Sequence, residues 1–204
     1  MSRRATIASV ELIEEAARLI CDEGYTDYRL AKLKAAERLG LGRSPSYPEN
    51  HQIESAVLDR QALFGGPEYF EHLRRMRVTA LRAMKLLDAF SPRLSGSVVT
   101  GAIGSGHRVQ IHVEADQPET VEMLLHDRRV RFEQDERRYR LADGRDQQVP
   151  LLCIEADGIG IDVVVFDPGT QRNPPLSRID GRPARRLPAD QVQALLDAAP
   201  YSGA

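Results

Sequence analysis

The residues best suited to chemistry lie in two separate segments of the chain. One is Asp162, a single carboxylate in the otherwise apolar run Ile159–Phe166. The other is Leu94–Val113, which contains four glycines and then alternates apolar with polar residues. Backbone N–H groups of a glycine-rich turn can bind phosphate oxygens. The expected function depends on how these two segments face each other.

Local patterns predict the strands that would hold these segments. Apolar and polar residues alternate over 109–113, which is typical of a half-buried strand. We therefore expect 94–113 to form two short strands joined by a glycine-rich turn. Asp157-Gly158 is a strong hairpin signal, and it predicts a turn between an apolar strand at 149–155 and the strand at 159–166.

The run Gly96-Ser97-Val98-Val99-Thr100-Gly101 matches the G-S-x-x-x-G signature of the DNA polymerase beta-like nucleotidyltransferases, and the chain resembles this superfamily over about half its length, residues 67–168. In that family S-D-x-D and a strand follow the signature, and a third carboxylate lies on a later strand. The resemblance implies an α+β fold: a nucleotidyltransferase-like mixed sheet with flanking helices, here preceded by a helical N-terminal region. It also implies that Gly96, Ser97 and Gly101 bind nucleotide phosphates, and that Asp162 is the third carboxylate.

The chain departs from the family pattern where the first two metal-binding aspartates should stand. In register with the signature, these positions hold Arg108 and Gln110. Glutamine offers one neutral oxygen to a metal ion, and arginine offers none. A guanidinium about 4 Å from Mg²⁺ would be repelled by roughly 8 kcal/mol at an effective dielectric constant near 20. We therefore expect a degenerate site without a metal, and little or no transferase activity.

The function expected from this pattern is binding of a nucleotide or polyphosphate. Arg108 would replace the charge of the metal ion and hold a phosphate group directly, as arginine forks can, with Gln110 beside it. A nucleic acid or a protein are the other partners that this interpretation allows.

Two alternatives remain open. In the first, the protein is an active nucleotidyltransferase that uses Mg²⁺ and rearranged ligands. His112 and Glu114 share a strand face with Gln110, and with Asp162 they would form the metal site. In the second, the N-terminal helices bind DNA, because Glu14–Tyr25 resembles the first helix and turn of TetR-type regulators. The prolines that follow in Gly42–Asn50 argue against a recognition helix at that position.

The composition sets wider limits. The chain has 204 residues, of which 42% are hydrophobic and 28% charged, and a net charge of −2, so overall charge gives no reason to expect nucleic acid. Its two cysteines, Cys21 and Cys153, are too far apart to suggest a disulfide framework or a zinc site. We expect a cytoplasmic protein without a membrane span, because no apolar run is long enough.

Hydrophobic periodicity divides the chain into three regions. Residues 1–66 form a helical N-terminal region, 67–170 form the nucleotidyltransferase-like core, and 171–204 form a tail rich in proline and arginine with a short C-terminal helix. The predicted helices cover 6–23, 28–39, 51–63, 68–89, 118–126 and 189–198, and a charged hairpin is expected at 130–141.

Overall fold

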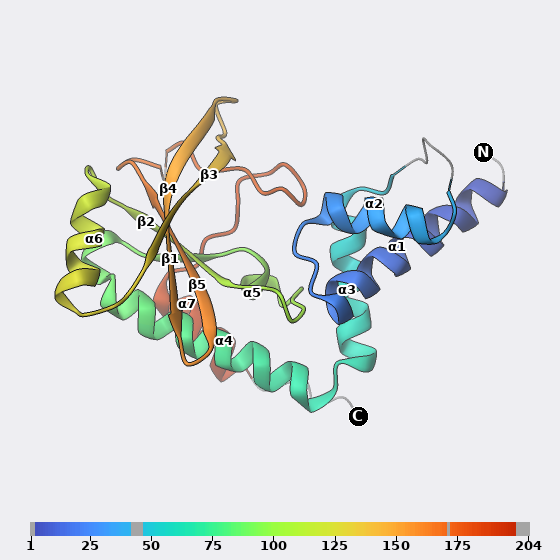
Figure 1. The fold of residues 1–204 in the computed structure, drawn as a ribbon, viewed down its shortest axis with the longest axis horizontal. Helices are drawn as coiled ribbons and strands as arrows, with labels where there is room; N and C mark the ends of the chain where they lie inside the picture. Colours follow the sequence, from blue (N-terminus) through green and yellow to red (C-terminus); the bar gives the residue numbers. More distant parts are fainter. Residues whose placement is uncertain (1–2, 42–46, 171, 199–204) are drawn as a thin grey trace. The chain divides into compact units, whose positions relative to one another are not determined.

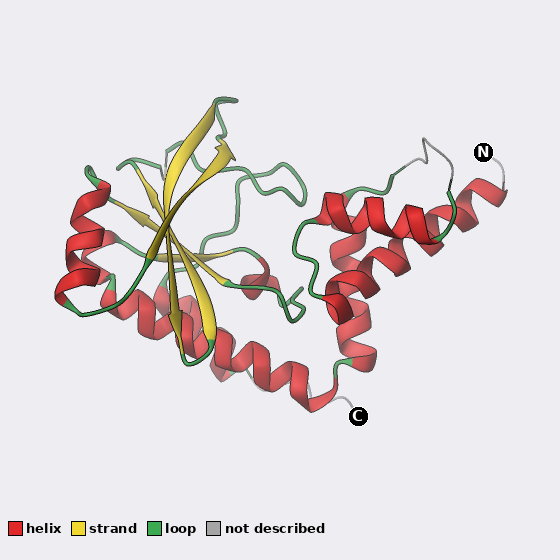
Figure 2. Cartoon of the chain, in the orientation of Figure 1, coloured by secondary structure: helices red, strands yellow, loops and turns green. Residues whose placement is uncertain are grey.

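The computed structural model describes residues 3–41, 47–170 and 172–198, and over these residues the protein is α+β (Figures 1 and 2). The helices are α1 (Arg3–Glu23), α2 (Tyr28–Arg38), α3 (Asn50–Phe64), α4 (Gly66–Leu86), α5 (Ser97–Thr100), α6 (Pro118–Asp127) and α7 (Ala189–Asp197), with a 3₁₀ turn at Asp88–Phe90. The strands are β1 (Arg93–Ser95), β2 (Val109–Glu114), β3 (Glu133–Arg140), β4 (Asp146–Ala156) and β5 (Ile159–Phe166).

The chain folds into two units. The first, a helical unit, contains the residues up to Phe70, together with Gly101–His107 and Arg178–Asp180. The second, a sheet unit, contains Glu71–Thr100, Arg108–Ser177 and the residues from Gly181 onward. Residues Gly101–His107 after α5 therefore belong to the helical unit, although α5, Arg108 and β2 belong to the sheet unit.

The helical unit is built around small and branched side chains from three helices. Alanines dominate the buried face of α2, which lets its backbone approach α1 closely, and α1 and α3 supply the larger side chains. The fully buried members are Leu12, Ala16, Leu19 and Ile20 of α1, Ala31 and Ala35 of α2, and Ile53 and Val57 of α3. Ala102 joins this core from the 101–107 segment.

The 101–107 segment packs so tightly on the end of α1 that two of its residues must be glycine. A Cβ atom at Gly104 would lie 1.9 Å from the Ile20 carbonyl oxygen, and one at Gly106 would lie 2.2 Å from the Gly24 oxygen. The buried Gln61 amide of α3 donates a 2.6 Å hydrogen bond to the carbonyl of Ile103. These contacts explain the two glycines by packing, whereas the sequence suggested only a turn.

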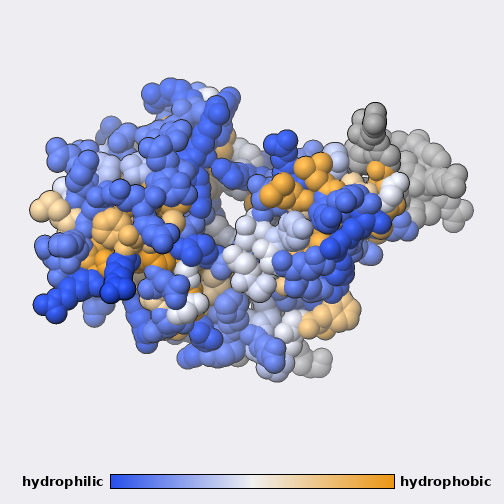
Figure 3. Space-filling model, viewed as in Figure 1, coloured by the Kyte–Doolittle hydropathy of each residue, from blue (hydrophilic) through white to orange (hydrophobic). Residues whose placement is uncertain are grey.

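Several large apolar side chains of the helical unit remain exposed, and Figure 3 shows orange surface over this part of the chain. The most exposed are Leu63 and Phe64 at the end of α3, at 75% and 73%. The Arg60 guanidinium lies 5.5 Å from the centre of the Phe64 ring, a cation–π contact. No helix within the described ranges is long and apolar enough to cross a membrane.

The sheet has the strand order β1-β2-β5-β4-β3 (Figure 1). Only β2 and β5 are parallel, and the other three pairs are antiparallel. Because side chains alternate along each strand, one face is continuously apolar and buried, and it carries Leu94, Val109, Ile111, Val113, Leu152, Ile154, Ile161, Val163 and Val165. Figure 1 draws α4 and α6, whose apolar faces are also buried, alongside the sheet. The opposite face carries Asp162, Gln110 and His112 beside a second buried apolar cluster, which consists of Tyr139, Val149, Leu151, Val164 and Phe166.

The predictions for the sheet unit are confirmed in part. The strand at 159–166 and the turn at Asp157-Gly158 are as predicted. The prediction of two short strands over 94–113 is wrong at Val98 and Val99, which lie in helix α5. Gly96 has a φ of +76°, which turns the chain out of β1 and starts this helix. The predicted hairpin at 130–141 is also wrong, because this segment supplies only β3, which pairs with β4.

Candidate functional site

The face of the sheet that carries Asp162 gathers the candidate residues around it. In the β2–β5 register Gln110 stands beside Asp162, and on the other side of β5 Cys153 stands opposite the same residue. Ser95, the last residue of β1, pairs with Gln110. Partners in a sheet point to the same face, so four neighbouring strands present side chains to one region.

Both carboxylate oxygens of Asp162 are bonded to arginines. Arg108 Nε lies 2.6 Å from Oδ1, and Arg137 Nη2 of β3 lies 2.7 Å from Oδ2. The Asp162 side chain is only 8% exposed, whereas those of Arg108 and Arg137 are 41% and 33% exposed. Burial disfavours the charge on Arg137, but the bond to Asp162 and the nearby Tyr139 more than offset this effect, so the pKa of Arg137 is raised. One aspartate and two arginines leave this cluster with a net positive charge.

The guanidinium of Arg108 lies flat on strand β5. Its Nη2 donates to the carbonyl oxygens of Ile154 and Ile161, each at 3.2 Å. A Cβ atom at Gly160 would lie 2.1 Å from Nη1 and 2.5 Å from Cζ of Arg108, so the missing side chain of Gly160 makes room for the guanidinium. Arg108 is thus held by four groups: one carboxylate, two carbonyls and a glycine surface.

We predict that Gly160→Ala pushes Arg108 away from Asp162 without altering either residue. The end of a long side chain can move, so the clash should cost the contacts of Arg108 and not the fold. We expect a loss of about 1 kcal/mol of unfolding free energy, because Arg108 is partly exposed and its pairing is screened by solvent. Urea denaturation would measure it. In an Arg108→Gln background the same glycine substitution should cost almost nothing, and an equal cost in both backgrounds would contradict this arrangement.

A second polar cluster adjoins Asp162 on the same face. The Gln110 amide nitrogen lies 2.8 Å from Nε2 of His112 and also bonds the hydroxyl of Tyr139. Since an amide nitrogen only donates, Nε2 of His112 accepts and the imidazole is neutral with its proton on Nδ1. His112 is 3% exposed and packs against the rings of Tyr139 and Phe166, at 5.7 Å and 4.9 Å between centres.

Burial lowers the pKa of His112 from an ordinary value of 6.5 to about 3, and the positive charges of Arg186 and Arg137 act in the same direction. The Nδ1 atom is buried and finds no hydrogen-bond partner among the described residues. An added proton would have to go to Nε2, which faces the Gln110 amide N–H, so the folded protein keeps His112 neutral.

This shift predicts a loss of stability in acid. As pH falls, the unfolded chain takes up a proton near pH 6.5 while the folded protein does not, so stability is lost between about pH 6.5 and pH 3. Between pH 7 and pH 5 the loss from this residue should be about 2 kcal/mol. Urea denaturation at both pH values, in the native protein and in His112→Phe, would measure it. The variant should lose about 2 kcal/mol less than the native protein, and equal losses would contradict a neutral, buried His112.

The structure brings together some of the predicted site residues and not others. Gly96 is close to Gln110, since a Cβ atom at Gly96 would lie 3.0 Å from the Gln110 Oε1. Ser97 is half-buried at the start of α5, next to Gly96. Gly101 instead belongs to the helical unit, where its carbonyl accepts a 2.8 Å hydrogen bond from the Tyr69 hydroxyl. The cluster around Asp162 therefore includes Gly96, Arg108 and Gln110.

The alternative metal ligands are spread along β2. Glu114 pairs with Phe166, four residues beyond the position of Asp162, and its charge acts on Arg186. In the part of the chain that the structure describes, no group of three His, Cys, Asp or Glu side chains is arranged to hold a metal ion. His112 contacts Gln110 and aromatic rings, as described above, and not Glu114.

Sequence reasoning missed two residues of this site, Arg137 and Tyr139. Both lie on β3, where charged residues on each face hide the alternation that would reveal a strand. A usable signal was present in Asp143-Gly144, a dipeptide typical of hairpin turns, which lies between β3 and β4. Recognising that turn would have paired 133–140 with the strand that faces Asp162.

No protein-family model matches this chain, and no curated protein matches its sequence.

Proposed function

We propose that this chain is a nucleotidyltransferase-like protein that binds the phosphates of a nucleotide through arginine, without a metal ion, and has little or no transferase activity. The observation that carries the proposal is the 2.6 Å bond between Arg108 Nε and Asp162 Oδ1. It places a cation of the protein itself against the carboxylate that the resemblance assigns to a metal.

The order of elements supports the fold half of this proposal. The G-S turn lies between β1 and β2, the strand after it runs antiparallel to β1, and Asp162 lies on a strand parallel to β2. Arg108 and Gln110, the positions where the family has its first two aspartates, lie just before β2 and within it, beside Asp162. These features agree with the arrangement that the resemblance implies, and the proposal extends them to the whole sheet unit.

The chemistry of the cluster supports the functional half. Two-metal phosphoryl transfer needs carboxylate oxygens to neutralise and position Mg²⁺. Here both oxygens of Asp162 are engaged by arginines and the amide of Gln110 is engaged by His112 and Tyr139. Nη1 of Arg108 makes no hydrogen bond to the described residues, and the side chain is partly exposed. This N–H group and the net positive charge suit a phosphate oxygen.

Isothermal titration calorimetry with ATP, GTP, CTP and UTP, in EDTA and in Mg²⁺, tests the proposal. We expect at least one nucleotide to bind in EDTA, and Mg²⁺ to leave the affinity unchanged or lower it, because it neutralises the phosphates. Arg108→Gln should weaken binding by about tenfold, the value of one charge-assisted hydrogen bond. Arg82→Gln, which removes the same charge from the exposed pair with Asp157, is the matched control. Mg²⁺-dependent binding with transfer of a labelled nucleotide would overturn the proposal.

A further inference from the structure

A cavity of about 1090 Å³ lies next to the Asp162 cluster. Arg108 and Cys153 line it, together with the end of α6 and the segment that follows this helix. Its volume is slightly above the usual range for small-molecule sites, about 300–1,000 Å³. Arg108 is therefore shared between the Asp162 cluster and this cavity, so a ligand bound to Arg108 has space to extend away from the sheet.

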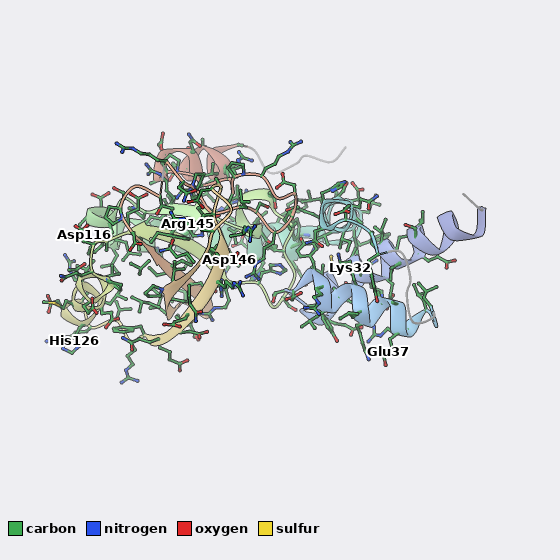
Figure 4. The ribbon with its side chains drawn as sticks, turned by 90° about the horizontal axis from the view of Figure 1, so that it is seen from above. Lys32, Glu37, Asp116, His126, Arg145 and Asp146 are labelled. Atoms are coloured by element: carbon green, nitrogen blue, oxygen red, sulfur yellow. The ribbon has the colours of Figure 1, made fainter. Side chains whose placement is uncertain are left out.

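Two more arginines line the cavity without any partner from the described chain. The side chains of Arg129 and Arg131 make no hydrogen bond or ion pair with the described residues. Arg138 and Arg140 of the neighbouring strand β3, by contrast, both contact Asp146. Figure 4 labels Asp146 well apart from His126, which lies at the end of α6 and also lines the cavity. The cavity thus brings together three arginines, two of which have no partner among the described residues.

The backbone of Arg129 gives an independent indication that this arginine serves a ligand. Its φ is +58°, the left-handed region that glycine occupies at low cost. The N–H of Arg129 bonds the carbonyl of His126 and that of Val130 bonds the carbonyl of Leu125, which is the pattern of a helix end that usually has glycine at this position. Arginine is less stable than glycine there, so stability does not account for its presence.

The rest of the lining fits a nucleoside better than a bare polyphosphate. Phe132 and Val130 are half-buried apolar residues on the cavity wall, and an aromatic ring can stack with a base. Asp127, Glu133 and Glu155 also line the cavity. Carboxylates would repel phosphates but accept hydrogen bonds from ribose hydroxyls. The arginines could therefore bind the phosphates, the carboxylates the ribose hydroxyls, and the Phe132 ring the base.

We infer that this cavity binds a nucleoside polyphosphate, with its phosphates on Arg108, Arg129 and Arg131 and its base on Phe132. This inference rests on the proposed function and adds the ligand class and the location of the nucleoside. It predicts that the protein distinguishes a nucleoside triphosphate from inorganic tripolyphosphate, which carries the same charged chain without ribose or base.

Calorimetry in EDTA with the four nucleoside triphosphates and with tripolyphosphate tests this inference. We expect one triphosphate to bind at least tenfold more tightly than tripolyphosphate. Phe132→Ala should remove that preference and leave tripolyphosphate binding unchanged. Arg129→Gly should weaken the triphosphate about tenfold, yet raise the unfolding temperature by about 2 °C because it relieves the backbone. Arg128→Ala removes the same charge one residue away, outside the cavity lining, and should leave binding unchanged.

The possible failures are distinguishable. If tripolyphosphate and the triphosphates bind equally, and Arg129→Gly and Phe132→Ala change nothing while Arg108→Gln still weakens binding, the cavity inference is wrong and the proposed function stands. If none of these ligands binds the native protein, both are wrong.

Discussion

Replacing both Arg108 and Arg137 with glutamine should cost the folded protein about 3 kcal/mol, because it leaves the buried carboxylate of Asp162 without a cation. Each arginine bonds one oxygen of this group, at 2.6 Å and 2.7 Å. Either single variant keeps one cation in place, so each alone should cost only about 1 kcal/mol. The double variant should therefore lose more than the two single variants together, and urea denaturation of the four proteins measures the difference as a double-mutant cycle.

The rescue for this experiment is a neutral residue at position 162. Asparagine has the shape of aspartate without its charge, so adding Asp162→Asn to the double variant should restore most of the lost stability. Strictly additive single effects, or a triple variant as unstable as the double variant, would show that the carboxylate does not depend on its two arginines. The folded protein would then have another way to hold the charge, and the argument against a metal at this site would be weakened.

The local pairing around Asp162 follows from sequence signals that act over short distances. The Asp157-Gly158 turn sets the register of the strands on either side of it, which puts Cys153 opposite Asp162. The apolar run of β5, interrupted by Asp162, is typical of a strand covered on both faces, and seven of its eight residues are buried. Both signals lie within a few residues of the elements they determine, so one sequence is enough to interpret them.

The partner of Asp162 could not be found in the same way. The repulsion between a guanidinium and Mg²⁺ predicts only that Arg108 avoids a metal, not where its side chain lies instead. In the structure the carboxylate attracts this arginine and Arg137 as well, which lies 25 residues away along the chain. The pairing depends on the β3–β4 register and on the space above Gly160, and both are tertiary features.

The glycines of 94–113 have two different structural roles, a turn near the candidate site and close packing in the helical unit. Gly96 is the one near Gln110 in the sheet unit, and its positive φ turns the chain into α5. Gly104 and Gly106 face the end of α1 in the helical unit. A glycine required by close packing and a glycine required by a phosphate look the same in a sequence, since both need a missing side chain. The difference lies in which atoms a Cβ would meet.

We predict that Gly104→Ala destabilises the helical unit by about 3 kcal/mol or more. The added Cβ would lie 1.9 Å from the Ile20 carbonyl oxygen and 3.1 Å from the Cα of Cys21, and these backbone atoms of α1 cannot rotate away as a side chain would. The 101–107 segment would have to leave its place, and the hydrogen bond from Gln61 to Ile103 would be lost with it. Amide hydrogen exchange of α1 and α3 would report the loss residue by residue.

Gly40→Ala is the matched control for this prediction. Gly40 belongs to the same unit and has a φ of +62°, but a Cβ there would meet no atom within 4 Å. It should therefore cost only the backbone strain of alanine in the left-handed region, about 1 kcal/mol. If Gly104→Ala proves no more harmful than Gly40→Ala, the segment does not pack on α1 as described. Its glycines would then again be open to the interpretation that the sequence first suggested, a turn that binds phosphate.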